Sequence, residues 1–439
     1  MKKFYQKTNI KILLLVGLII RLASSPWSIH SDVNATYWWG KFAQEFGLRG
    51  YYDWLFFGGH GRPDQPMINI YYNLIVRQIY LFLYKIFWFL NIKIPVFPSK
   101  LMQWYFDYGN QILLKIPMII ADMLIIYFGY KFISKYLSPA KAKIFALVLT
   151  LYPPLIYNSA VWGSGDSIVS LLALLAVYQA WRKKYYSSVL LLFISILYKP
   201  SLIIWGPLYL IVLLKNKISF KTFLLLFVFS LILVYVTCFP FSPIEINPII
   251  WFFKTMTIKI LPGIMDQVTA NALNFWALLY GLEPRLDASL FIGSLSARLF
   301  SLLLCVVFYV YELKNLFKEY SLKRLLLSLV NITMITFCFM TRMHERYSFP
   351  ALIPLFLLAL FDRRYLRYFI LLSLTHSLNV YYGWWTPFLP KLVSFLKNIT
   401  VIRLISLINV LITLKLVFLY PKIKNTNSRQ SNPPPPKSK

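Results

Sequence analysis

The sequence predicts an all-α, polytopic membrane protein that crosses the bilayer about twelve times. Hydrophobic residues make up 59% of the 439 positions, and charged residues make up only 14%. The apolar residues recur in runs of about 14 to 23, close to the roughly 20 residues that a helix needs to cross a bilayer. The net charge of +31 comes from short basic clusters between these runs, so it indicates membrane topology. A soluble fold is excluded, and no single basic patch supports nucleic-acid binding.

Each apolar run defines one expected span. In chain order the predicted spans are 12–27, 112–131, 144–161, 167–181, 187–198, 201–214, 222–240, 289–311, 325–340, 348–361, 366–384 and 399–420. Lysines precede the first span and basic clusters recur in alternate loops, which places these segments in the cytoplasm by the positive-inside rule. The basic segments are Lys2 to Lys11, 131–143, 182–184, 215–221, 314–324, 363–367 and the tail from Lys422.

Two regions depart from simple spans. The stretch 68–90 carries Arg77, Gln78 and Lys85 and is rich in Tyr and Trp, so we expect an interfacial or re-entrant helix there. The predicted spans 187–198 and 201–214, which Lys199-Pro200 joins, are both shorter than a full crossing. We therefore expect the Lys199 ammonium near the depth of lipid phosphates.

The chain is predicted to hold one membrane domain, residues 1–420. Its two large external loops are 28–111 and 241–288, and the basic, Pro-rich segment 421–439 is expected to be a disordered cytoplasmic tail. The N-terminal span has no clear small-x-small cleavage site, so it is expected to be an uncleaved signal anchor. The sequence contains no P-loop, no GxGxxG after a strand and no HExxH, and Cys238, Cys305 and Cys338 lack the spacing of metal ligands.

The densest polar motif is the segment 341–350, TRMHERYSFP, between two apolar runs. Arg342, His344, Glu345 and Arg346 lie within five residues of one another and on the predicted external side. Charged groups at a bilayer are costly, and paired guanidinium groups suit phosphate oxygens. We therefore predict that Arg342 and Arg346 bind an anionic group, with headgroup anchoring or an ion pair to Glu345 as the alternative. His344 either donates to the ligand or pairs with Glu345.

Two carboxylates in the first external loop are candidates for acid–base chemistry. Asp32 follows the first span directly in HSDVN, and Asp64 lies in RPDQP. A carboxylate at the membrane surface can accept the proton of an acceptor hydroxyl. Helix capping or simple solvation is the alternative for Asp32, and turn formation is the alternative for Asp64.

Two further constellations complete the external polar groups. YPPLIYNSAVWGSGDS combines a Pro-Pro helix interruption with a Gly-rich turn that presents Asp166 at the start of the next span, as a substrate ligand or as an N-cap. ANALNFW places Asn271 and Asn274 beside Trp276, a combination that suits sugar hydroxyls but also serves as an interfacial anchor.

These segments together resemble a known family. The segments are HSDVNATYWW, PDQPMINIYY, LLKIPMIIADML, YNSAVWGSGDS, LLFISILYKPSL, ANALNFWALL and TRMHERYSFPAL, in order over about residues 30 to 355. The set resembles the multispanning glycosyltransferases of the C superfamily (GT-C). More narrowly, it is similar to predicted membrane mannosyltransferases related to the enzyme that adds the second mannose to GPI anchors.

The resemblance implies transfer of a hexose, with mannose expected, from a polyprenyl- or dolichyl-phosphate carrier to a glycan, lipid or protein acceptor. It implies a site on the non-cytoplasmic face of a bacterial plasma membrane or an ER membrane. The catalytic base would be Asp32, the donor phosphate would be held by Arg342, Arg346, His344 and Lys199, and substrate would contact Asp64, Asp166, Glu345, Asn271 and Asn274. No cofactor is expected. Many relatives carry Asp-x-Asp in the first loop, where this chain has Asp32-Val33-Asn34, so the use of a divalent cation is left open.

Two other function classes fit some of the same features. A transporter or flippase of lipid-linked sugars would use many spans, buried charges and Pro-interrupted helices. A lipid-linked polysaccharide ligase or polymerase would also use external Arg and His. Against transport, the two halves of the chain show no internal repeat, and the polar groups concentrate in external loops.

Overall fold

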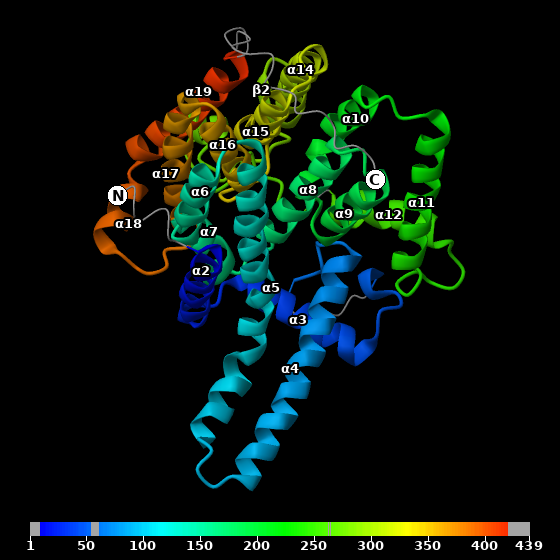
Figure 1. Ribbon diagram of the computed structural model, residues 1–439, viewed down its shortest axis with the longest axis vertical. Coiled ribbons are helices and arrows are strands. Elements are labelled where there is room, and N and C mark those ends of the chain that lie inside the picture. The colour runs from blue at the N-terminus through cyan, green and yellow to red at the C-terminus, as the bar shows by residue number, and fades with distance from the viewer. Residues whose placement is uncertain (1–8, 54–60, 262, 264, 420–439) are drawn as a thin grey trace.

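The computed structural model describes residues 9–53, 61–261, 263 and 265–419 (Figure 1). The expectations for Lys2, Lys3 and Lys7 and for the tail 421–439 concern residues outside these ranges. The helices of the first half are α2 (Ile10–Ser24), η1 (Ser25–Trp27), α3 (Ser31–Phe46), η2 (Tyr51–Asp53), α4 (Met67–Lys93), α5 (Ser99–Tyr136), α6 (Pro139–Thr150), α7 (Pro153–Ile156), η3 (Tyr157–Trp162), α8 (Asp166–Trp181), α9 (Tyr185–Tyr198), η4 (Pro200–Trp205) and α10 (Gly206–Lys215).

The second half continues the helical pattern with two minimal sheets. Its helices are α11 (Phe220–Cys238), α12 (Pro248–Thr255), η5 (Met256–Ile260), α13 (Phe275–Tyr280), α14 (Ala297–Lys318), α15 (Leu322–Phe339), α16 (Phe349–Phe361), η6 (Arg363–Tyr365), α17 (Leu366–Gly383), α18 (Pro390–Lys397) and α19 (Ile399–Phe418). Strand β1 (Thr269–Ala270) pairs in parallel with β4 (Met343–His344), and β2 (Leu290–Ile292) pairs antiparallel with β3 (Leu295–Ser296). The fold is therefore essentially all-α.

Seven helices in the described ranges are long and apolar enough to cross a membrane. They are α2 with η1, α4, α5, α11, α14, α15 and α19, and the bent pair of α6 with α7 and η3 makes an eighth if it counts as one span. Four more apolar segments, α8, α9, η4 with α10, and α16, are 10 to 17 residues long. A straight crossing needs about 20 residues, so the structure supports a polytopic helical protein but not the full count of twelve spans.

Most element boundaries follow the apolar runs, but the predicted span 289–311 is wrong at both ends, because its first residues form the β2–β3 hairpin and α14 runs from Ala297 to Lys318. The predicted spans 167–181 and 348–361 correspond to α8 and α16, which begin at Asp166 and Phe349. The Pro-Pro interruption is also observed: the helix axis bends by 50° between Pro139–Thr150 and Pro153–Trp162. Proline lacks the N–H that a continuing helix needs and clashes with the preceding turn, which accounts for the break at this point.

The stretch 68–90 differs most from its predicted form. It lies in α4, a continuous helix of 27 residues that is long and apolar enough to span a bilayer, whereas we expected an interfacial or re-entrant helix. The predicted span 112–131 is part of α5, which has 38 residues and begins at Ser99. Figure 1 shows α4 and the first part of α5 as a long hairpin projecting from the bundle. Stacked rings of Tyr80 and Tyr105, with centroids 5.1 Å apart, join its two arms.

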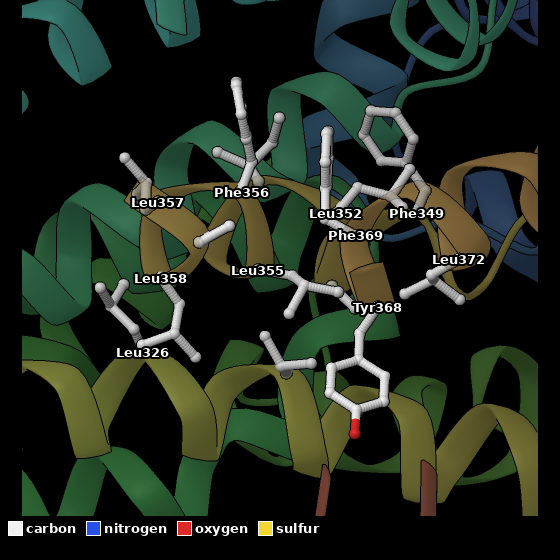
Figure 2. Close-up of a cluster of buried hydrophobic side chains, with 14 of the residues drawn as sticks. Leu326, Phe349, Leu352, Leu355, Phe356, Leu357, Leu358, Tyr368, Phe369 and Leu372 are labelled. Carbon is white, nitrogen blue, oxygen red and sulfur yellow. The ribbon is translucent and has the colours of Figure 1, made fainter. Parts of the chain in front are cut away.

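The hydrophobic core surrounds α15. In the 18-residue window of this helix, 94% of the residues are buried, so the helix is enclosed by protein on all sides. Figure 2 shows the part of the core where α16 and α17 pack together, with Phe356 stacked on Phe369 at 4.4 Å between ring centroids. This close packing gives α15 and α16 fixed positions, and the loop between them carries the segment 341–348.

A buried ion pair ties the first helix to the bundle. The Arg21 Nε donates to Asp122 Oδ2 at 2.7 Å, and both side chains are fully buried. The Arg21 guanidinium also donates to the carbonyls of Leu149 and Thr150, where α6 ends, and the Ser159 hydroxyl donates to Asp122. A buried charge is stable only when it is paired in this way. The ion pair therefore fixes the position of α2 against α5 and η3. It thereby also fixes where the segment that follows α2 begins.

Candidate functional site

Four segments far apart in the sequence meet at one end of the bundle. Asp32 lies in the first turn of α3, Asp166 is the first residue of α8, Lys199 joins α9 to η4, and Arg346 lies in the loop between α15 and α16. The structure thus brings together four of the residues predicted for the site. Their side chains form one network of charges.

The Arg346 guanidinium is the centre of this network. Its Nη2 lies 3.2 Å from Asp32 Oδ2, its Nη1 donates to Glu345 Oε1 at 2.7 Å, and its Nε lies 3.6 Å from Asp166 Oδ2. The side chain is 13% exposed. Among the described residues, Nε has no hydrogen-bond acceptor within reach although it is buried. The Nε–H group therefore faces the Asp166 carboxylate without forming a hydrogen bond to it.

Asp32 is oriented by aromatic and cationic groups. The Trp162 indole N–H donates to Asp32 Oδ2 at 3.1 Å, and the His30 Nδ1 lies 3.4 Å from Oδ1. His30 also accepts a hydrogen bond from the Asp32 backbone N–H, so His30 is the N-cap of α3. Asp32 itself therefore does not cap this helix. Burial opposes ionisation of this carboxyl, but the neighbouring Arg346 charge holds its pKa well below the ordinary value. Its side chain is 42% exposed, so a substrate can reach it.

A Gly-rich turn presents Asp166 to the network. Gly163 has φ +82°, a conformation that L side chains rarely adopt, and a Cβ at this position would lie 2.6 Å from a Val33 methyl group of α3. The turn therefore needs glycine to approach α3, as the GSGD pattern predicts. Asp166 accepts from the Ser164 hydroxyl at 2.7 Å and forms a buried ion pair with Lys199.

A cavity of about 780 Å³ opens onto these groups. Asp64 lies on its wall and accepts from its neighbour Gln65 at 2.9 Å. Burial raises the pKa of the Asp64 carboxyl, the Gln65 hydrogen bond lowers it, and the nearby Asp32 charge raises it further. Further polar groups that the sequence did not single out also line the cavity: Asn34, Thr36, Arg62, Asn69 and Gln111. Such a volume, with a few converging polar groups, is typical of a small-molecule site.

Arg342 lies apart from this cavity. Its Nε donates to Asp287 Oδ2 at 2.7 Å, and Arg298 binds the same carboxylate at 2.7 Å through Nη2. Arg342 has φ +64°, and its backbone N–H donates to the Gln267 carbonyl, which directs it toward the segment 241–288. Arg298 lies at the start of α14. The two arginines of TRMHER therefore do not share one binding position.

His344, Asn271 and Asn274 hold the loops that carry the site. His344 lies in β4, forms a bridge with Asn271, and has Nδ1 3.9 Å from Glu345 Oε2. Asn274 caps α13 and donates to the Phe337 carbonyl at the end of α15, with its side chain fully buried. Neither asparagine lines the cavity that contains Asp32. Asn274 therefore serves helix entry, but the interfacial-anchor interpretation of ANALNFW is wrong, because Trp276 is fully buried and its indole N–H donates to the Phe339 carbonyl.

Lys115 is a residue that the sequence argument missed. This fully buried ammonium on α5 donates to three backbone carbonyls, those of Ser25 at 2.9 Å, Ser28 at 2.6 Å and Val161 at 2.8 Å. Ser25 and Ser28 precede Asp32, and Val161 precedes Trp162, which donates to Asp32. Lys115 thus joins the two segments that orient the Asp32 carboxylate. A Lys inside an apolar run is itself a signal of a functional site, and the LLKIP pattern contained it.

The arrangement suits an anionic substrate with a reactive hydroxyl nearby. The guanidinium of Arg346, the ammonium of Lys199 and the carboxylates of Asp32 and Asp64 line one cavity. Among the described residues, no group of three or more His, Cys, Asp or Glu side chains is placed to hold a metal ion. No family model and no curated protein sequence matches the chain.

Proposed function

We propose that the protein transfers a hexose, most simply mannose, from a polyprenyl- or dolichyl-phosphate carrier to an acceptor hydroxyl on the non-cytoplasmic face of the membrane. The observation that carries the proposal is the contact between Asp32 and Arg346, 3.2 Å apart on the wall of one cavity. The Asp32 carboxylate suits a hydroxyl proton, and the Arg346 guanidinium suits a phosphate. The family resemblance of the seven ordered motifs points to the same reaction.

The proposed step moves one sugar and one proton. The acceptor oxygen forms a bond with the anomeric carbon of the sugar while the bond from that carbon to the carrier phosphate oxygen breaks. Asp32 takes the hydroxyl proton, and the phosphate gains negative charge as it leaves. Arg346 supplies the N–H donors for that charge, and Lys199 adds a second cation near the same cavity.

Arg346 also links donor binding to the strength of the base. Without donor, its charge holds the pKa of Asp32 low, and a carboxylate with such a low pKa is a weak proton acceptor. A donor phosphate competes with Asp32 for the guanidinium, because both are anions at hydrogen-bond distance. When the phosphate takes this partner, the pKa of Asp32 rises and the carboxylate becomes a better base, so proton removal follows donor binding.

The decisive experiment separates transfer from transport. Purified protein is incubated with radiolabelled polyprenyl-phosphate mannose and membrane lipid acceptors, and parallel samples contain sealed vesicles. We expect label in a new glycosidic product. Movement of label into vesicles without a new glycosidic bond would establish a transporter instead, and products with many added sugars would indicate a polymerase.

The external position of the site can be tested by labelling. Arg62 is exposed and lines the cavity, and Lys184 is exposed at the opposite end of α8. In intact cells an impermeant maleimide is expected to label Arg62→Cys, whereas Lys184→Cys is labelled only after the membrane is opened. The three native cysteines are buried and give a low background. The reverse pattern would place the cavity in the cytoplasm.

Lys115 is expected to act as a positioning residue. Lys115→Met leaves three carbonyls without their donor and loosens the segments that orient Asp32, so kcat should fall about 100-fold while the donor KM changes much less. Lys141→Met is the matched control, because the Lys141 ammonium also donates to a backbone carbonyl, that of Leu360, away from the cavity. Equal losses in kcat for both variants, or a rise in KM alone, would contradict this role.

A further inference from the structure

A second cavity lies at the end of the bundle opposite the Asp32 site. Its volume is about 340 Å³, and α5, α8, α15 and α16 form its walls. Helix α8 begins with Asp166 at the first cavity and ends with Trp181 at the second. The first cavity reaches Gly165, just before α8, whereas the second is lined along α8 from Leu171 to Trp181, and the two cavities share no lining residue. The second cavity is therefore a separate site from the one that Asp32 lines.

The walls of this second cavity are mainly aliphatic. The apolar lining residues are Ile125, Phe128, Phe132, Leu171, Leu174, Leu175, Val177, Leu322, Leu325, Leu326, Leu329, Ile353 and Leu357. Figure 2 labels Leu326 and Leu357 at the edge of the core cluster. The Phe128 side chain is 39% exposed, so the wall formed by α5 reaches the surface of the bundle. An aliphatic groove of this kind accommodates a hydrocarbon chain.

Three cations line the same cavity at its polar end. Lys131 and Lys135 lie on the last turns of α5, and Arg182 follows α8. Within the described part of the chain, no carboxylate lies within ion-pair distance of any of them. The nearest organised groups are tyrosine rings: Lys131 lies 4.4 Å from the Tyr127 centroid, and the Arg182 guanidinium lies 5.7 Å from that of Tyr178.

Two buried polar atoms at this end have no partner among the described residues. They are Arg182 Nε and Gln179 Oε1, and both residues line the cavity. A buried donor without an acceptor is destabilising, more so when it is charged, so a ligand that accepts from Arg182 would relieve this cost. Phosphate oxygens accept well from guanidinium groups.

We infer that this groove binds an anionic phospholipid from the leaflet that the basic loops face, with an acyl chain along the leucine-lined walls and the headgroup phosphate at Arg182, Lys135 and Lys131. Charge complementarity selects the occupant: three cations without carboxylate partners favour a lipid with net negative charge over a zwitterionic one. An acidic peptide would not fill the aliphatic part of the groove. The lipid would bridge α5 and α8 with α15.

Native mass spectrometry of the full chain in detergent tests this inference. The probes are phosphatidylglycerol and phosphatidylcholine of equal chain length. We expect the wild-type protein to retain phosphatidylglycerol preferentially, and the double variant Lys135→Gln/Arg182→Gln to lose about tenfold in its affinity for phosphatidylglycerol with its phosphatidylcholine binding unchanged. Lys314→Gln/Lys318→Gln is the matched control, since these two exposed lysines of α14 lie outside the groove at the same end of the molecule.

A second variant tests the apolar half of the site. Leu175→Trp fills the groove without changing charge and is expected to reduce retention of phosphatidylglycerol as well. Equal retention of the two lipids by the wild type, or full retention of phosphatidylglycerol by both the charge variant and Leu175→Trp, would overturn the inference. Polyprenyl phosphate is the remaining probe: if it displaces phosphatidylglycerol at equal concentration, the occupant is the carrier lipid and the phospholipid assignment is wrong.

Discussion

Replacing Asp32 with Asn is expected to reduce sugar transfer by about 100- to 10,000-fold while donor affinity is kept or increased, because the neutral amide no longer competes with the donor phosphate for Arg346. Asn has the same shape and keeps the hydrogen bond from the Trp162 indole, but its amide cannot take the acceptor proton. Turnover of the radiolabelled donor and equilibrium binding of the donor are measured separately. The effect should appear in kcat, because the carboxylate acts after the donor is bound.

Asp53→Asn is the matched control for this experiment. Asp53 lies in the same N-terminal region and pairs with Lys259, but it does not line the cavity. Near-normal turnover of the Asp32 variant would remove Asp32 from the role of base. Asp64 would then be the next carboxylate to test, because it lines the same cavity and burial raises its pKa.

Replacing Arg346 with Ala is expected to weaken donor binding by about 10- to 100-fold, the range for losing charge-assisted hydrogen bonds. The variant also leaves the carboxylates of Asp32 and Glu345 without the guanidinium between them. Because Arg346 holds the pKa of Asp32 low, its removal raises that pKa. The acid limb of the pH–rate profile should therefore move to higher pH. Donor binding and the pH profile are both measured.

Arg342→Ala provides the comparison within the same loop. Its guanidinium binds Asp287 and lies outside the cavity, so we expect a much smaller change in donor affinity than for Arg346→Ala. Arg346→Lys should restore only part of the affinity, because an ammonium cannot reproduce the two-pronged geometry of a guanidinium. An unchanged donor affinity in Arg346→Ala would favour an anchoring role for this side chain.

Local sequence rules located most of the helices. Boundaries such as those of α8, α16 and α19 follow the change from apolar to polar residues, because each helix interior must satisfy its backbone internally in an apolar environment. The same rules failed for 68–90. The few polar residues in that stretch suggested an interface, but the helix continues over 27 residues because α5 packs along it through stacked aromatic rings.

Residue chemistry by itself identified Asp32, Asp166, Lys199 and Arg346 as candidates, because charged groups beside apolar runs are costly and therefore informative. Only the tertiary structure decided which candidates meet. The parallel pairing of β1 with β4 and the left-handed backbone at Arg342 send that arginine to Asp287, whereas Arg346 reaches Asp32. Lys115 acquires its role in the same way, from three carbonyls that are distant in sequence. Hydropathy is a property of neighbouring residues and can be taken from the sequence, but long-range pairing depends on packing directions that the sequence pattern does not contain.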